Sequence, residues 1–210
     1  GSKNTISDLQ YLKSSGIDKK IKECAADETE LIGICGGYQM LGKRIIDKDC
    51  VESGSSTEDG LGFLDMVTSF YPEKATYQVK AVHIDSGIEV SGYEIHMGRS
   101  SEARSQKSEA RSHVPVFKII KRGRDIVELM DGLKTEDGRI WGTYMHGIFE
   151  NDFFRREFLD SIRIKKGLQP LKTAAKYNRE DEYDKLAEVI RNNINMDEIY
   201  RIMGLDRAGG

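Results

Sequence analysis

The chain has 210 residues and a formal net charge of −3, a length that predicts one domain with a buried core and room for a small appendage. Its basic residues are balanced by acidic ones and scattered, which argues against a nucleic-acid surface, and no apolar run approaches the roughly 20 residues needed to cross a membrane. Since no secretory signal begins the chain, we expect a cytoplasmic protein that binds neither nucleic acid nor membrane.

The first predicted elements are two short helices, which lead to a strand at residues 31–34. Thr5 or Ser7 can cap the first helix, and apolar residues recur at helical spacing from Leu9 onward. The pattern is interrupted at residues 14–16, Ser-Ser-Gly, where we expect one helix to end and the next to begin.

Residues 31–42 carry the clearest chemical signal. A mostly apolar strand ends at Cys35, which lies among glycines, and a helix whose core face includes Ile45 is expected to follow. A sharp strand-to-helix turn presents its central side chain at the end of a sheet. The helix N-terminus is expected to lower the pKa of a thiol there, and the backbone N–H of Gly36 can face an oxyanion. Cys35 is therefore a candidate nucleophile, although glycine-rich turns also cradle phosphates and free cysteines are often simply buried.

The other two cysteines, Cys24 and Cys50, lie in polar surroundings without glycine turns. Three cysteines without a C-x-x-C pair suit neither a disulfide framework nor a zinc site, so no metal is expected. We interpret both cysteines as structural and the compartment as reducing.

The middle of the chain is predicted to be rich in strands. Residues 47–62 are polar and glycine-rich, which is typical of a loop. Apolar and polar residues then alternate in five segments that we predict to be strands, at 63–70, 76–82, 87–95, 116–120 and 125–129. Residues 100–113 contain two copies of a charged Ser-Glu-Ala-Arg-Ser pentad, which indicates a solvated loop.

The C-terminal part is predicted to be mainly helical. A strand at 139–145 ends at His146, and Asn151 or Asp152 can cap the helix that follows. Residues 183–203 carry apolar side chains at the spacing of a packed helix pair.

Four segments, in order along the chain, resemble the triad (class I) glutamine amidotransferases. Residues 33–39, Gly-Ile-Cys-Gly-Gly-Tyr-Gln, match the nucleophile motif G-x-C-x-G-x-Q of that family. Residues 1–5, 92–98 and 142–149, which read GSKNT, GYEIHMG and GTYMHGIF, are similar to the subgroup found at the C-terminal end of cobyric acid synthases. Four ordered motifs are far more specific than any one of them.

The resemblance implies two catalytic residues. Cys35 corresponds to the nucleophile, and His146, in Tyr-Met-His-Gly, corresponds to the general base. The broader family has an acid two residues after this histidine, whereas Ile148 stands there in this chain. We therefore favour a Cys-His dyad, with Glu150 or Glu94 as the alternatives for an acid that orients the imidazole.

The same resemblance implies the residues that bind the substrate. The backbone N–H of Gly36 and the loop of Gly1 and Ser2 would form the oxyanion hole. Gln39, at the last position of the nucleophile motif, would contact the substrate glutamine, and His96 is a further candidate for substrate binding.

The implied fold is α/β, with a flavodoxin-like, mostly parallel sheet flanked by helices and with antiparallel additions from the middle of the chain. In the family, the first matched segment follows the first strands of the domain, so those N-terminal strands are expected to be missing here. Residues 1–165 would form the amidotransferase domain, and residues 166–210 a helical tail packed on it.

The implied function is that of the glutaminase half of a cobyric acid synthase. Hydrolysis of glutamine would supply ammonia for the ATP-dependent amidation of cobyrinic acid a,c-diamide carboxylates in cobalamin biosynthesis. No G-x-x-x-x-G-K-[ST] phosphate loop occurs in these residues, so no cofactor is expected in this domain. ATP, Mg²⁺ and the corrinoid substrate are expected to bind an N-terminal synthetase domain of the same protein, which would be the partner of this chain.

Two alternatives remain open. The glutaminase subunit of a cell-wall (lipid II) amidating ligase shares Cys-Gly-Gly-Tyr-Gln, but residues 92–98 and 146–149 fit cobyric acid synthases better. The other alternative is a non-catalytic interaction domain that has kept the amidotransferase fold, and the presence of both Cys35 and His146 argues against it.

Overall fold

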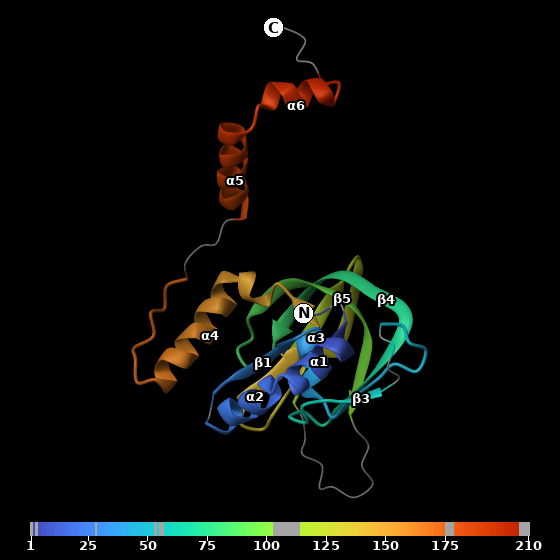
Figure 1. Cartoon of the computed structure of the whole chain (residues 1–210). Helices are drawn as coiled ribbons and strands as arrows, with labels where there is room; N and C mark the ends of the chain where they lie inside the picture. The colour runs from blue at the N-terminus through green and yellow to red at the C-terminus, as the bar shows by residue number, and fades with distance from the viewer. Residues whose placement is uncertain are drawn as a thin grey trace, which may run out of the picture. The chain divides into compact units, whose positions relative to one another are not determined.

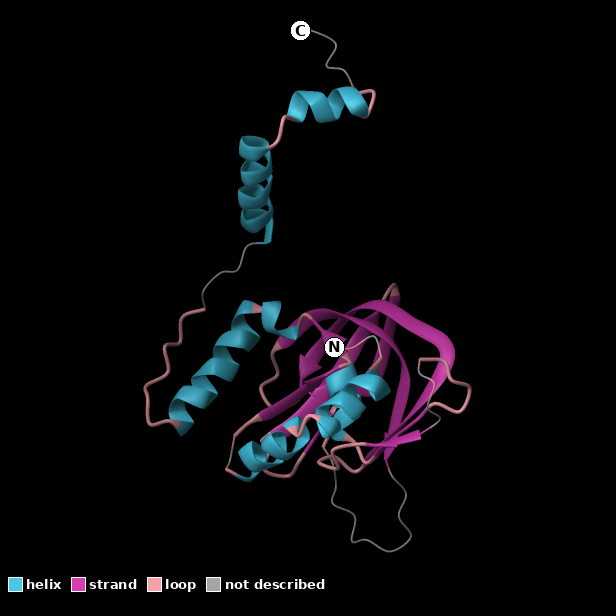
Figure 2. Cartoon of the chain, viewed as in Figure 1, coloured by secondary structure: helices cyan, strands magenta, loops and turns pink. Residues whose placement is uncertain are grey.

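Two β-sheets of different size form the framework of residues 1–172 (Figures 1 and 2). This computed structural model describes residues 2, 4–27, 29–52, 54, 57–102, 114–174 and 179–205. The chain divides into two compact units, Gly1–Lys172 and Thr173–Gly210, and both sheets belong to the first. The predicted α/β class is confirmed.

The small sheet is flanked by helices on both faces. Strand β1 (Leu31–Ile34) pairs in parallel with β9 (Ile140–Thr143), and β8 (Leu133–Lys134) completes the sheet on the far side of β9. Ile140 packs in one core with helices α1 (Thr5–Ser14), α2 (Ile17–Ala26) and α3 (Gly36–Leu41). The next residue, Trp141, packs in a second core with α4 (Asp152–Lys165), because successive side chains of a strand point to opposite faces.

The large sheet is built mainly from antiparallel hairpins. Its order is β10-β5-β4-β2-β3, and a further hairpin of β6 and β7 joins it through β6 and β4. The bounds are β2 (Arg44–Ile46), β3 (Thr57–Asp59), β4 (Met66–His83), β5 (Glu89–Glu102), β6 (Phe117–Arg122), β7 (Asp125–Asp131) and β10 (Met145–His146). A 3₁₀ turn, η1 (Ile148–Glu150), lies between β10 and α4.

The share of parallel pairs is smaller than the sequence predicted. In the described residues, only β1 with β9 and β2 with β4 pair in parallel. Short turns connect β4 to β5 and β6 to β7, and a strand that returns through a short turn must pair antiparallel.

Several local predictions are corrected by the structure. Asn4, rather than Thr5 or Ser7, caps α1, and its Oδ1 accepts from Ser7 N at 3.2 Å. The helix after Cys35 ends at Leu41, so Ile45 is buried in β2 instead. The predicted strands at 63–70 and 76–82 are one strand, β4, with an irregular register between Phe70 and Ala75.

The second unit contains α5 (Arg179–Asn193) and α6 (Met196–Ile202), which confirms the predicted pair of helices at 183–203. The unit begins after Lys172, a few residues beyond the predicted boundary at 165. That this tail packs on the first unit stays a prediction. No helix in the described part of the chain is long and apolar enough to cross a membrane.

Candidate active site

Cys35 lies in a strained turn at the carboxyl end of β1. Its backbone is left-handed, with φ 53° and ψ −110°, a conformation that costs a residue with a side chain on the order of 1–3 kcal/mol. The turn is fixed by a hydrogen bond of 2.8 Å from Cys35 N–H to the carbonyl of Thr143 on β9. Glycine is required at position 33, because an added Cβ there would lie 2.7 Å from the backbone N and Cα of Tyr38. The sequence thus folds α3 sharply back over β1 and leaves Cys35 at the bend.

The thiol of Cys35 is held against the large sheet. Its Sγ donates a hydrogen bond of 3.4 Å to the carbonyl of Ile95 on β5. Burial raises the pKa of the thiol, and the charges of Glu52 and Asp131 raise it further, while a hydrogen bond from the backbone of Gly36 lowers it. The N–H group at the helix N-terminus thus lowers the pKa as expected, but desolvation is the larger effect and the net pKa is raised.

The predicted oxyanion groups lie on one side of Cys35. An added Cβ on Gly36 would be 3.1 Å from Ser2 N and 3.0 Å from Ser2 Cβ, so the two residues are in close contact. The hydroxyl of Ser2 accepts from Asn4 N at 3.0 Å and donates to a carboxylate oxygen of Asp8. Gly1, the third predicted member, lies outside the described residues.

Cys35 opens into a cavity of about 330 Å³. Gln39 lines it from α3 and is only 2% exposed. The side-chain amide of Gln39 is fixed between Thr5 Oγ1, 3.2 Å from its Oε1, and Tyr144 Oη, 3.5 Å from its Nε2. An added Cβ on Gly98 would lie 2.3 Å from this Nε2, so a larger residue there would displace the Gln39 amide. The structure brings Cys35, Gln39, Ser2 and His96 to the same cavity.

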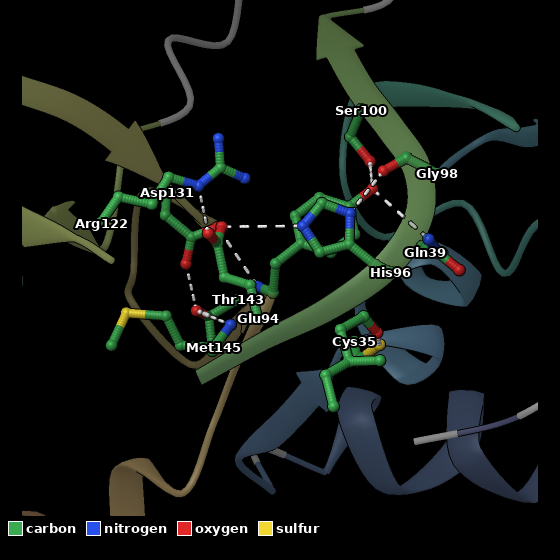
Figure 3. Close-up of polar contacts among 12 residues, drawn as sticks. Cys35, Gln39, Glu94, His96, Gly98, Ser100, Arg122, Asp131, Thr143 and Met145 are labelled. Atoms are coloured by element: carbon green, nitrogen blue, oxygen red, sulfur yellow. Dashed lines mark hydrogen bonds and ion pairs between the residues drawn. The ribbon is translucent and has the colours of Figure 1, made fainter. Parts of the chain in front are cut away.

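His96 lies on β5 at the centre of a buried polar cluster (Figure 3). Its Nδ1 donates to the carbonyl of Gly98 at 2.8 Å, and its ring stacks on Tyr144 with centroids 3.9 Å apart. Its Nε2 faces Glu94 at 3.6 Å, and the same carboxylate accepts from Arg122 at 2.7 Å. Burial would raise the pKa of Glu94, but its polar contact with His96 and the charge of Arg122 outweigh it and hold the pKa below its usual value.

A second buried carboxylate supports the end of β9. Asp131 on β7 accepts from the hydroxyl of Thr143 and from Tyr144 N, the latter at 3.2 Å (Figure 3). Burial raises the pKa of Asp131 to about 6. Sequence reasoning missed both Asp131 and Arg122, because they lie on a hairpin far from the motifs and no local pattern marks them.

His146 lies on β10, at the same end of the small sheet as Cys35. Ile34 and Thr143 are register partners, so Cys35 and His146 both follow the carboxyl ends of neighbouring parallel strands. The imidazole stacks on Tyr93 of β5, with centroids 5.0 Å apart and planes 4° apart. Burial lowers the pKa of His146. In the described part of the chain, no hydrogen bond joins this imidazole to Cys35.

The turn after His146 is held by the side chain of Asn151. Its Nδ2 donates to the carbonyls of Ile148 at 2.9 Å and Gly147 at 3.2 Å, and its Oδ1 accepts from Ser91 N at 2.9 Å. Asn151 occupies the N-cap position of α4 as predicted, but its side chain makes no cap hydrogen bond because these contacts use it. Gly147 has φ 76°, in the left-handed region that glycine adopts without strain.

A family model for the CobB/CobQ-like glutamine amidotransferase domain matches residues 1–154. Among curated proteins, a cobyric acid synthase of Clostridium botulinum (strain Langeland) is 44% identical over 208 residues, which are 98% of this chain and 41% of the relative. A cobyric acid synthase of Caldanaerobacter subterraneus subsp. tengcongensis is 42% identical over 214 residues, 97% of this chain and 41% of the relative. The chain thus spans about two fifths of the length of these relatives.

Among solved structures, a glutamine amidotransferase from Thermotoga maritima matches with a TM-score of 0.40 and 17% identity, over 81% of this chain and 64% of that one. The family model, by contrast, extends over well more than half of the chain and includes Cys35 and His146. This chain therefore belongs to the CobB/CobQ-like glutamine amidotransferase domain family.

Proposed function

We propose that this chain hydrolyses glutamine through Cys35 and His146 as the glutaminase part of a cobyric acid synthase. The observation that carries the proposal is the strained left-handed turn of Cys35, which holds the thiol at the wall of a cavity in a chain that the family model matches. A buried cysteine with a merely structural role needs no such strain.

In the proposed reaction, the Cys35 thiol transfers its proton to His146, and Sγ attacks the carbon of the substrate amide. The backbone N–H groups of Gly36 and Ser2 stabilise the oxyanion. The close contact between these two residues supports this role, and Gly1 would contribute from the same loop. Protonated His146 delivers its proton to the departing ammonia. Water then hydrolyses the glutamyl thioester with His146 as the base.

We propose a dyad rather than a triad. The carboxylate of Glu94 is already bound by Arg122 and faces His96, so it is not available to orient His146. The imidazole of His146 is positioned instead by stacking on Tyr93. The proposal requires the ring to reach Cys35 Sγ when glutamine is bound. A neutral imidazole is the form that accepts a proton, and the lowered pKa of His146 favours that form.

The ammonia would be consumed by a synthetase part of the same protein. The relatives named cobyric acid synthase are more than twice as long as this chain, which leaves room for such a part. We propose that ATP, Mg²⁺ and a cobyrinic acid a,c-diamide bind there, and that activated carboxylates of the corrinoid accept the ammonia.

The experiment is a measurement of glutamate and ammonia release from glutamine, with and without the separately expressed synthetase part. Cys35→Ala and His146→Ala are each expected to lower the rate by at least about 10³-fold, because each removes a group that acts in both chemical steps. Cys50→Ala is the matched control, since Cys50 is exposed and also has a positive φ of 51°. Full activity in either Cys35→Ala or His146→Ala would refute the dyad.

A further inference from the structure

Glu52 is a charged side chain on the wall of the Cys35 cavity that the proposed reaction does not use. It lies within the polar segment after β2, residues 47–62, and lines the cavity together with Cys35, Gln39 and Lys74. No motif in the sequence marks it.

The carboxylate of Glu52 is only partly satisfied. In the described part of the chain, its Oε2 is buried and has no hydrogen-bond partner. The carboxylate accepts a hydrogen bond from the backbone N–H of Thr5, and its Oε1 lies 3.3 Å from Thr5 Oγ1, but the same hydroxyl lies 3.2 Å from Gln39 Oε1. One hydroxyl hydrogen cannot fully serve two acceptors. A buried carboxylate oxygen without a donor is costly, so its presence on a cavity wall indicates a cationic or donor ligand.

The electrostatic surroundings of Glu52 favour a cation. Burial raises the pKa of its carboxyl group, hydrogen bonds from Thr5 lower it, and the negative charges of Asp47 and Asp8 raise it. These neighbours add to the negative potential at the unsatisfied oxygen. Lys74, on the irregular segment of β4, contributes the opposite charge to the same cavity. The cavity therefore offers one acidic and one basic side chain.

The size of glutamine matches this arrangement. In a free amino acid of this length, the α-ammonium nitrogen lies at most about 5 Å from the amide carbon. The charge of Glu52 acts on the Cys35 thiol, so both groups are within reach of one small molecule. The volume of the cavity, about 330 Å³, lies at the lower end of the range for small-molecule sites.

We propose that Glu52 binds the α-ammonium group of the substrate glutamine and so selects a free amino acid over other primary amides. The ammonium supplies the donors that Oε2 lacks, and Lys74 faces the α-carboxylate. The inference rests on the proposed function, because it takes glutamine as the ligand of this cavity.

The test is ligand-observed NMR titration of the Cys35→Ala chain, which binds without turnover. The ligands are L-glutamine and its deamino analogue, 4-carbamoylbutanoate. Glu52→Gln is expected to weaken glutamine binding by roughly 10- to 100-fold, the effect of losing a hydrogen bond to a charged group, and to leave the affinity for the analogue within about twofold. Asp49→Asn, which removes an exposed carboxylate from the same segment, is expected to change neither affinity.

Each other result overturns the inference. Equal weakening of both ligands would show that Glu52 only maintains the segment, and unchanged glutamine binding would show that it plays no part in recognition. If the chain with native Glu52 binds the analogue but not glutamine, the site is not built for an amino acid. If it binds neither ligand, the proposed function fails, and the inference fails with it.

Discussion

The turn of Cys35 and the turn of His146 lie at the same sheet edge but are built by different means. The Cys35 turn is fixed by backbone contacts, namely the hydrogen bond from its N–H to Thr143 and the close approach of Gly33 to Tyr38. The His146 turn is held by side chains, two of them from distant strands, Tyr93 and Asp131, and one from the end of the turn itself, Asn151. A nucleophile that must stay in one position is thus fixed through its backbone. A base that must move a proton is held by contacts that leave its imidazole nitrogens free of hydrogen bonds in the described structure.

Among substitutions in these two turns, Gly33→Ala is expected to have the largest effect on stability. Its Cβ would lie 2.7 Å from two backbone atoms of Tyr38, which cannot yield as a flexible side chain can, so we expect a loss of about 3 kcal/mol in the free energy of unfolding. Gly37→Ala is the matched control, because an added Cβ meets nothing within 4 Å, and a helical glycine replaced by alanine gains up to about 1 kcal/mol. Urea unfolding measures both. Equal losses would mean that the turn is not fixed by close approach.

The next effect concerns Asp131, which supports the His146 turn. Its folded pKa of about 6 lies above the ordinary 3.8, so its contribution to stability is present below that ordinary value and is lost as the pH rises through 6. The shift of about two units corresponds to roughly 2–3 kcal/mol between pH 3 and pH 7.5. Asp131→Asn removes this titration. The stability of the variant relative to the native chain should therefore rise by roughly 2–3 kcal/mol between pH 3 and pH 7.5. Parallel pH profiles of the two proteins in urea unfolding would contradict the assignment.

A smaller effect is expected from Gly147→Ala. An added Cβ would meet no atom closer than 3.7 Å, so the cost is only that of the left-handed backbone at φ 76°, about 1 kcal/mol. Gly138→Ala is a matched control, with φ 68°, open space around it and no part in the site. Both variants should lose similar thermal stability, whereas only Gly147→Ala should lower glutamine hydrolysis. Equal activity of the two variants would show that the conformation of the His146 turn does not affect catalysis.

The smallest effect is expected from Tyr93→Leu, which removes the ring stacked on His146. Burial lowers the pKa of His146, so greater hydration of the imidazole should raise that pKa. The fall of kcat/KM toward acidic pH should then begin at a higher pH, while the rate at pH 8 stays within roughly twofold. Tyr93→Phe keeps the stacked ring and should leave the pH profile unchanged. A shift in both variants would assign the effect to the lost hydroxyl.

Features that depend on neighbouring residues could be predicted from the sequence, whereas features that depend on distant segments could not. The strand before Cys35, the turn itself and the helix from Asp152 depend on neighbouring residues, and the structure has them where the sequence predicted. The end of α3 was missed, because Gly42 lets the chain approach Met66 of β4, and that contact is not local. The single strand β4 was missed because Pro72 and the register irregularity divide its pattern.

The candidate site shows the same division. Cys35, Gln39, His96 and His146 lie in motifs, and three of these four line the Cys35 cavity. The cluster of Glu94, Arg122 and Asp131 and the cavity position of Glu52 depend on strand pairings between distant segments. Burial raises the pKa values of Asp131 and Glu52, and no single stretch of sequence specifies burial.

The left-handed backbone at position 35 also limits which nucleophiles this fold can use. Cysteine, serine and threonine all serve as nucleophiles in enzymes. At φ 53°, an unbranched side chain is strained but tolerated, whereas a second heavy atom on Cβ makes the conformation a genuine outlier. The bend that exposes the thiol therefore excludes threonine on steric grounds, and a change of reaction chemistry on this scaffold is restricted to exchange between sulfur and a primary hydroxyl.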